Sequence, residues 1–154
     1  MTDFLSVEAL VEGILQAGSG TKQVLGQRFA SHLGLEPGKQ GGDGGIDGFG
    51  QVGACRVYFQ SKLERQPLDA SRAAEFYGNI VNRADVGVLL SGLPCTLGFR
   101  DRLEILDPKL HERFAIHLLS LGDLFGESAA FRRAIADLHP LRDLSDGGWR
   151  SLLP

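Results

Sequence analysis

Apolar side chains recur at intervals of three and four residues along several stretches of the chain. This spacing places them on one face of an α-helix and predicts helices that are buried on one side. Thr21 is the expected N-cap of the second helix, Gly34 its expected C′ residue, and Asp69 the expected N-cap of the third. The predicted helices cover residues 4–16, 22–33, 69–83, 97–106 and 127–138.

Shorter runs between these helices predict strands. Residues 54–63 are rich in strand formers and follow a glycine-rich loop, 38–50, that leads into a hairpin. The apolar runs 86–90 and 115–119 are typical of strands that are covered on both faces. Helices, a hairpin and then alternating helices and strands predict an α/β fold with a mixed β-sheet flanked by helices, in a single domain.

The hairpin turn decides which residues of its two strands face each other. Gly53-Ala54 has the Gly-X pattern of a type II′ turn, and a turn there places Asp47 opposite Gln60. A turn at Gly50-Gln51 would place Asp47 opposite Ala54 instead. We expect the first register, because its turn chemistry is the better match.

Side chains alternate between the two faces of a strand, so the residues of the second hairpin strand divide into two sets. One set is expected to face the core: Val57, Phe59, Ser61 and Leu63. The other set is expected on the opposite face: Arg56, Tyr58, Gln60 and Lys62. Gln60 and Lys62 therefore share a face, and the expected register brings Asp47 to them.

A carboxylate, an amide oxygen and an ammonium group in one place suit metal-assisted cleavage of a phosphodiester bond. Asp47 and Gln60 offer the hard oxygen ligands that Mg²⁺ prefers, and the Ser61 carbonyl adds a further one. The metal stabilises negative charge on the phosphate and acidifies a water. Lys62 orients that water or neutralises the developing charge.

At these residues the sequence resembles the Mrr-like branch of the PD-(D/E)XK nucleases. The resemblance rests on Gly42-Asp43-Gly44-Gly45-Ile46-Asp47-Gly48 and on a strand that ends in Phe59-Gln60-Ser61-Lys62. It continues through Phe76-Tyr77-Gly78, 86–90 and 119–125. It implies a restriction-endonuclease-like α/β core over about residues 20–126. The predicted N-terminal helix in 1–19 and the C-terminal helix and tail in 127–154 flank this core in the same domain. It also implies DNA as substrate and Mg²⁺ as cofactor, with Mn²⁺ as a substitute.

The sequence departs from that family at the position of its first-helix glutamate, which falls on Gln23. Gln23 can accept a hydrogen bond from a metal-bound water but brings no charge, so Asp47 is the one firm anionic ligand unless Asp43 helps. Two alternatives to an active nuclease therefore stay open. One is a catalytically weak DNA-binding member of the fold, and the other is a nuclease subunit or effector that a partner protein activates. A homodimer would supply one active centre for each DNA strand.

Composition adds few constraints. The net charge of −3 argues against a DNA binder held by overall charge, but it allows a local basic patch. The candidate phosphate contacts are Lys39, Arg56, Arg65 and Arg72. No stretch approaches the roughly twenty apolar residues of a membrane helix, and the start of the chain is acidic where a secretory signal would be basic. We therefore expect a cytoplasmic protein without a membrane partner.

The cysteines, a glycine pattern and one histidine are expected to have structural roles. Cys55 and Cys95 fit no zinc or redox spacing and are expected to be buried thiols rather than a bridge. Residues 48–53 match the G-x-G-x-x-G pattern, but a strand follows them where a dinucleotide site needs a helix. His117 lies in an apolar run and is expected to be a hydrogen-bonded core residue.

Overall fold

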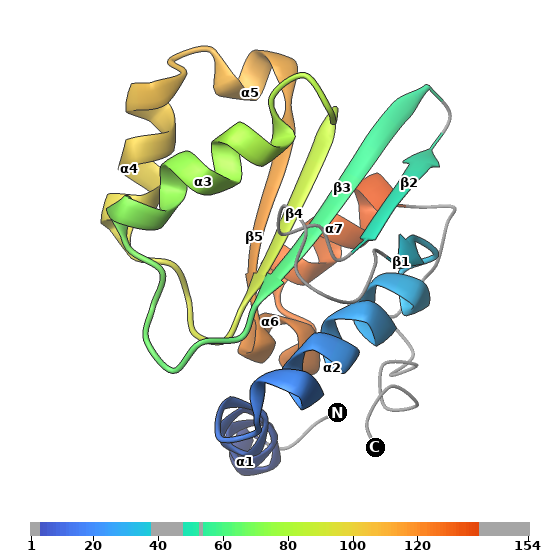
Figure 1. Ribbon diagram of the computed structural model, residues 1–154, viewed down its shortest axis with the longest axis vertical. Helices are drawn as coiled ribbons and strands as arrows, with labels where there is room; N and C mark the ends of the chain where they lie inside the picture. Colours follow the sequence, from blue (N-terminus) through green and yellow to red (C-terminus); the bar gives the residue numbers. More distant parts are fainter. Residues whose placement is uncertain (1–3, 38–47, 53, 139–154) are drawn as a thin grey trace.

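The computed structural model of the protein describes residues 4–37, 48–52 and 54–138, which form an α/β fold with helices on both faces of one mixed sheet (Figure 1). The strands are β1 (Glu36–Pro37), β2 (Gly48–Val52), β3 (Cys55–Lys62), β4 (Val86–Ser91) and β5 (Ala115–Ser120). The helices are α1 (Phe4–Leu15), α2 (Ser19–His32), α3 (Ala70–Ile80), α4 (Leu97–Leu106), α5 (Leu110–Arg113), α6 (Leu121–Gly126) and α7 (Ala129–Leu138). The expected α/β class and the mixed sheet flanked by helices are confirmed.

The five strands lie side by side in chain order, antiparallel from β1 to β3 and parallel from β3 to β5. Within the hairpin, Gly48 pairs with Phe59 and Val52 pairs with Cys55. This is the register that a turn at Gly53-Ala54 predicts, and the register of a turn at Gly50-Gln51 is wrong. β1 is only two residues long, too short for a periodic pattern to reveal.

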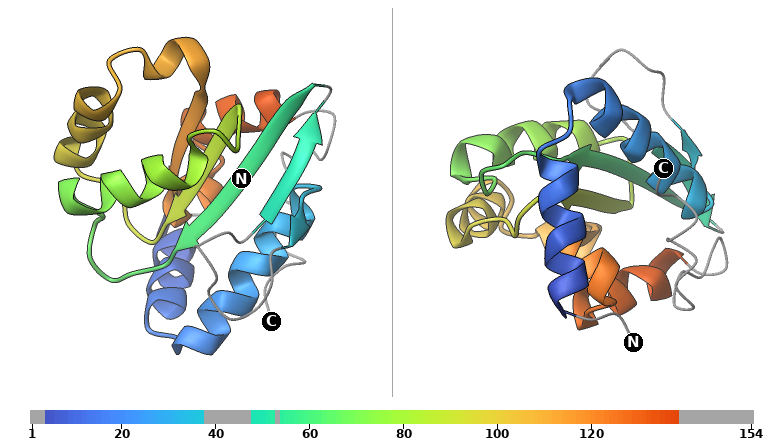
Figure 2. Two further views of the ribbon diagram at one scale, coloured as in Figure 1. Left: turned by 45° about the horizontal axis from the view of Figure 1, so that its top comes forward. Right: turned by 90° about the horizontal axis from the view of Figure 1, so that it is seen from below.

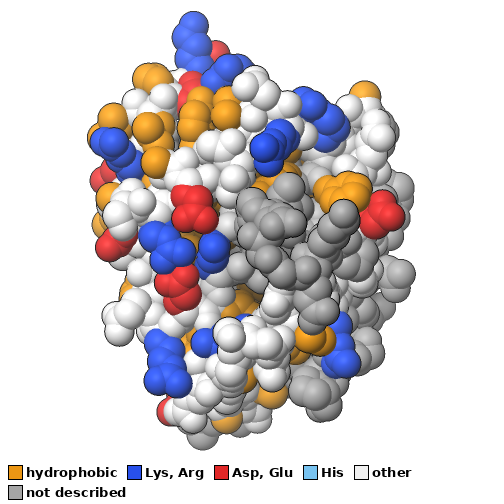
Figure 3. Space-filling view, in the orientation of Figure 1, with side chains coloured by type: hydrophobic (Ala, Val, Ile, Leu, Met, Phe, Trp, Pro, Cys, Tyr) orange, Lys and Arg blue, Asp and Glu red, His pale blue; other side chains and the backbone are white. Residues whose placement is uncertain are grey.

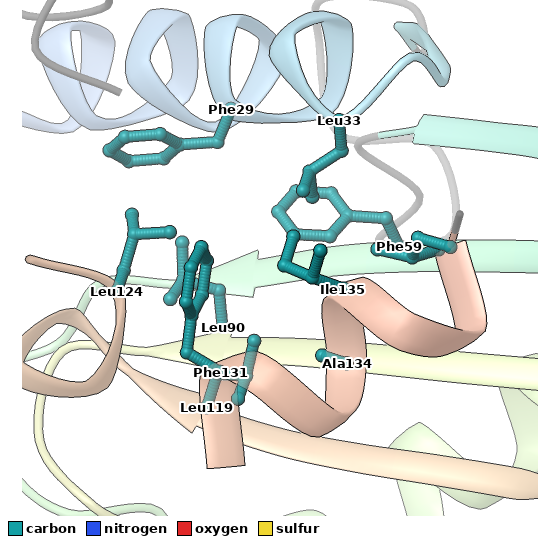
Figure 4. Close-up of a pocket in the computed structure, with 10 residues that line it drawn as sticks. Phe29, Leu33, Phe59, Leu90, Leu119, Leu124, Phe131, Ala134 and Ile135 are labelled. Atoms are coloured by element: carbon teal, nitrogen blue, oxygen red, sulfur yellow. The ribbon is translucent and has the colours of Figure 1, made fainter. Parts of the chain in front are cut away.

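One face of the sheet carries the larger core, which is built with α1, α2, α6 and α7. Figure 4 shows Phe29 of α2 on the side of this layer opposite Phe131 of α7, and Leu33, directly after α2, beside the ring of Phe59 of β3. The cavity that these and neighbouring apolar residues enclose measures about 10 Å³. It is too small and too apolar for a ligand, so this layer is structural.

The other face of the sheet carries a second core, built with α3, α4 and α5. Tyr58 and Leu89 of the sheet pack there with Phe76 of α3 and Phe99 of α4. Figure 2 shows the two groups of helices on opposite sides of the sheet. The predicted division of β3 is therefore correct, with Val57 and Phe59 in the larger core, but Tyr58 on the second face is also buried.

The ends of the first three helices match the predictions in part. Gly34 follows α2 with a positive φ of 83°, and the Asp69 side chain accepts a hydrogen bond from the Ser71 N–H at 3.0 Å, as expected for a C′ residue and an N-cap. Thr21 is not a cap, because α2 already begins at Ser19 after Gly18. α3 ends at Ile80, short of the predicted 83, since Asn82 adopts a left-handed conformation with φ 67°.

The C-terminal part of the described chain departs further from expectation. The predicted helix over 127–138 begins only at Ala129 and is preceded by the separate helix α6. Glu127 separates the two, with a left-handed φ of 51°. β5 lies at the edge of the sheet and is half-buried over most of its length rather than covered on both faces. His117 within it contacts the Asp137 carboxylate of α7 at 2.5 Å, so it has the expected polar partner.

Cys55 is exposed and Cys95 is half-buried, and both are free, so the expectation of two buried thiols is wrong for Cys55. In the part of the chain that the structure describes, no helix is long and apolar enough to cross a membrane.

Candidate active site

The candidate site lies at the carboxyl-terminal end of β3, on the face that α3 covers. Gln60 and Lys62 both point to this face, as the alternation of the strand predicts. Gln60 is buried, with 1% of its surface exposed, whereas the Lys62 side chain is 28% exposed. The end of the strand therefore presents a buried amide and, two residues later, a partly exposed ammonium group.

The buried amide of Gln60 is unusual in its hydrogen bonding. No donor among the described residues reaches its Oε1 atom. Most buried polar side-chain atoms in proteins have a hydrogen-bond partner, and leaving one without costs about 1–3 kcal/mol. Its neighbours Phe76, Leu89 and Phe99 are apolar and offer it no side-chain donor. Gln60 Oε1 is thus an acceptor held ready for a ligand, a water or a donor beyond the described residues.

Beside this amide, four charged side chains form a linked cluster between β3 and α3. Lys62 Nζ lies 3.6 Å from Glu75 Oε1, and Arg72 Nε lies 3.9 Å from Glu75 Oε2. Arg72 also donates two short hydrogen bonds, 2.8 and 2.9 Å long, to the two carboxylate oxygens of Glu64. These bonds raise the pKa of the Arg72 guanidinium. Figure 3 shows positive and negative side chains lying together on this face of the molecule.

The amide and the charges meet in one small cavity, which we call the Gln60 recess. Its lining combines four polar side chains with four apolar ones: Gln60, Lys62, Arg72, Glu75, Leu68, Phe76, Leu89 and Phe99. Its volume of about 10 Å³ is close to what a single water-sized species occupies. The recess can therefore hold one water or one ion against Gln60, but no organic ligand.

The carboxylate predicted for this site lies outside the described residues. Asp47, Asp43 and Lys39 all fall in residues 38–47. The described chain resumes at Gly48, whose strand partner Phe59 is the residue before Gln60. A Cβ atom at Gly48 would lie 2.5 Å from the Ala30 Cβ of α2, so the close packing of α2 on β2 requires glycine directly after Asp47.

Gln23, the predicted contributor from the first family helix, is not brought to the recess. It lies on α2, which packs against the opposite face of the sheet from α3. No described hydrogen bond joins Gln23 to Gln60 or Lys62.

The predicted phosphate contacts lie at different ends of β3. Arg72 lines the recess, and Arg65 follows the same end of the strand, where its Nε donates to the Leu15 carbonyl at 3.2 Å. Arg56 lies four residues before Gln60, about 13 Å away along a strand. Its backbone N–H and guanidinium both bind Asp85, at 2.7 and 3.3 Å, and hold the pKa of that carboxyl below its usual range. Arg56 thus has a structural partner at the far end.

Sequence reasoning missed Glu75 and Glu64. The periodicity of α3 puts Ala73, Phe76 and Ile80 on its buried side, and Glu75 adjoins that side. This pattern indicates a residue near the core, but it does not reveal which strand residue the helix packs against. The contact between Lys62 and Glu75 depends on the crossover from β3 through α3 to β4.

Within the described residues, no three histidine, cysteine, aspartate or glutamate side chains lie close enough together to hold a metal. A metal at the Gln60 recess would therefore be held by a mixed set of ligands, in which the amide oxygen of Gln60 and at most two carboxylates of the described residues take part.

The chain matches no known family model, no characterised protein and no solved structure at a significant level. The function is therefore argued from the residues of this chain.

Proposed function

We propose that the protein is a Mg²⁺-dependent endonuclease of the Mrr-like kind that hydrolyses phosphodiester bonds in DNA. The observation that carries the proposal is the buried, unpartnered oxygen of Gln60 beside Lys62, at the two strand positions that the sequence motif singles out. The register of β2 and β3, predicted from a turn at Gly53-Ala54, agrees with this proposal.

The donor set fits a magnesium ion. Mg²⁺ binds through hard oxygen atoms, commonly one or two carboxylates, substrate phosphates and several waters. Gln60 Oε1 is an oxygen of this type with no competing donor among the described residues. Asp47 is proposed as the charged ligand, since it is bonded to Gly48 and consecutive Cα atoms lie about 3.8 Å apart. The Ser61 carbonyl is proposed as a further ligand.

In this proposal each residue of the site has a defined role. A bound Mg²⁺ supplies positive charge that stabilises the scissile phosphate as its negative charge grows. Lys62, at the exposed edge of the recess, donates a hydrogen bond to a phosphate oxygen or to the attacking water. Phe76 and Phe99 keep bulk water from Gln60, which strengthens each electrostatic contact at this position. Arg65 binds a flanking phosphate, and Arg72 holds Glu64 through its two hydrogen bonds at the side of the recess.

The second candidate is a catalytically weak DNA-binding protein of the same fold. It is favoured by the lack of a three-carboxylate cluster in the described residues and by glutamine at positions 23 and 60. Activation by a partner protein and assembly as a homodimer also stay predictions.

The deciding experiment incubates the purified chain with supercoiled and linear DNA in Mg²⁺ or in chelator. We expect nicking and linearisation in Mg²⁺ alone. Lys62→Ala should lose this activity, and the exposed lysine variant Lys109→Ala should keep it. DNA binding by a wild-type chain that never cuts would favour the weak binder, and cutting that begins only when a cell extract is added would favour the activated subunit.

A further inference from the structure

The Gln60 recess contains one carboxylate to which the sequence motif gives no role, that of Glu75. We propose that Glu75 is a metal ligand and that it acts together with Gln60 Oε1. The inference rests on the proposed function for the choice of a divalent metal, but it concerns binding and stands apart from cleavage.

The bonding of Glu75 distinguishes it from its neighbour Glu64. Both oxygens of Glu64 accept short hydrogen bonds, 2.8 and 2.9 Å long, from Arg72. Among the described residues, the two oxygens of Glu75 have only distant cations as partners, Lys62 at 3.6 Å and Arg72 at 3.9 Å. Glu64 is therefore held by a bidentate partner, whereas Glu75 keeps its lone pairs available.

Releasing Glu75 from Lys62 costs little. The Lys62 side chain is 28% exposed and that of Glu75 is 51% exposed. Ion pairs with this much solvent contact contribute about 0–1 kcal/mol to stability. A divalent cation can therefore replace the ammonium of Lys62 as the partner of Glu75, and Lys62 is then free to reach a phosphate.

The independent sign of a ligand is Gln60 itself. Its Oε1 is buried and has no described donor, and Gln60 lines the same recess as Glu75. A cation there would give a partner both to the neutral oxygen of Gln60 and to the loosely held carboxylate of Glu75. Water and phosphate oxygens would fill the remaining positions from the side of the recess where Lys62 and Glu75 are exposed to solvent, which gives the usual ligand set of Mg²⁺. Glu75 thus provides, from a helix, the negative charge that Gln60 lacks on the strand.

The charge balance of the cluster adds a consequence. Lys62 and Arg72 offset Glu64 and Glu75, so the four side chains have no net charge to attract a dication. Phosphate oxygens of DNA add the missing negative charge. Metal and DNA are therefore expected to strengthen each other's binding.

The test measures Mn²⁺ binding to the full chain by electron paramagnetic resonance, with and without a DNA duplex. Glu75→Gln should weaken Mn²⁺ binding at least about tenfold. The matched variant Glu64→Gln, which removes the same charge from the same cluster, should leave affinity within about threefold, with thermal melting in chelator as the check on folding. In the wild type, Mn²⁺ should broaden the NMR signal of the Gln60 side-chain amide.

Equal Mn²⁺ affinity in Glu75→Gln and wild type would overturn the inference, as would a Gln60 signal that Mn²⁺ leaves sharp. Parallel cleavage assays separate this result from the proposed function. If the wild type cuts DNA while Glu75→Gln both binds and cuts normally, the nuclease stands and the role of Glu75 falls. If Mn²⁺ binding depends on Glu75 but the wild type never cuts DNA, the metal site stands and the nuclease falls.

Discussion

Lys62 Nζ lies 3.6 Å from Glu75 Oε1 and so links the carboxyl-terminal end of β3 to α3, at the edge of the recess that holds the Gln60 amide. The contact places a cation, an anion and an unpartnered neutral oxygen around a space for one small species. Such a combination is poorly explained by stability alone, since the ion pair is half-exposed and the orphan oxygen is a cost. The proposed metal ion and phosphate would give both features a role.

If Gln60 is retained for function, its removal should stabilise the fold. Gln60→Leu replaces a buried unpartnered amide by an apolar side chain of similar size. We expect the free energy of unfolding in chelator to rise by about 1–3 kcal/mol, while metal-dependent cleavage is lost. Chemical denaturation measures the first effect. The exposed Gln51→Leu should change stability by less than about 0.5 kcal/mol. A less stable Gln60→Leu would mean that the amide has a strong partner within the protein.

Gln60→Glu should make the stability of the fold depend on bound metal. A carboxylate at a position that is 1% exposed loses its hydration, so in chelator the variant should melt below the wild type. Mg²⁺ should then raise its melting temperature more than that of the wild type, because the added charge tightens metal binding. Differential scanning fluorimetry across a Mg²⁺ series is sufficient. Identical Mg²⁺ responses of the two proteins would place the metal elsewhere.

Both substitutions are made at Gln60. The sequence predicted the position of this residue on the strand, but it did not predict that the residue is buried. The alternation along β3 and the turn at Gly53-Ala54 are local features, and they correctly gave the shared face of Gln60 and Lys62 and the pairing of Gly48 with Phe59. What covers that face depends on the packing of α3, which joins distant parts of the chain. Neither the 1% exposure of Gln60 nor the contact with Glu75 follows from any local pattern.

Some helix ends could likewise be predicted from the local sequence, and others could not. Asp69 could be predicted as an N-cap because its side chain bonds within its own turn, to Ser71. Thr21 has the same chemistry but lies inside α2, which begins at Ser19 after a Gly18 that makes no side-chain cap.

The placement of Asp47 stays a prediction, since it lies outside the described residues.

The structure also predicts how acid destabilises the protein. Asp107 is buried, which opposes its ionisation, but the hydrogen bonds that it accepts from Arg113 and Tyr77 outweigh this and lower its pKa. Because the folded state holds the lower pKa, this contribution to stability is present at neutral pH and is lost as the pH falls below about 4. Asp107→Asn should melt lower than the wild type at pH 7, and this deficit should shrink in acid. The exposed Asp101→Asn serves as the control, and a deficit independent of pH would contradict this account.

Of the two arginines near the ends of β3, only Arg65 should contribute to DNA binding. Arg65→Ala should weaken binding to duplexes of any sequence and reduce the slope of log affinity against log salt by about one. Arg56→Ala, at the far end and bound to Asp85, should leave both unchanged. Fluorescence anisotropy at several salt concentrations tests the pair. The opposite result would move the DNA to the end of the sheet that carries Asp85.

The most direct test of the proposed nuclease is the rate at which Asp47→Ala cuts supercoiled DNA in Mg²⁺, compared with the wild type and with Lys62→Ala. Removing the proposed charged ligand should abolish metal-dependent cutting. Lys62→Ala should lose cutting nearly as completely while Mn²⁺ still binds, because only the assistance to water and phosphate is removed. Melting curves must first show that both variants are folded. We predict no cleavage above the chelator control for Asp47→Ala, and a folded Asp47→Ala protein that cuts at the wild-type rate would contradict the proposed active site.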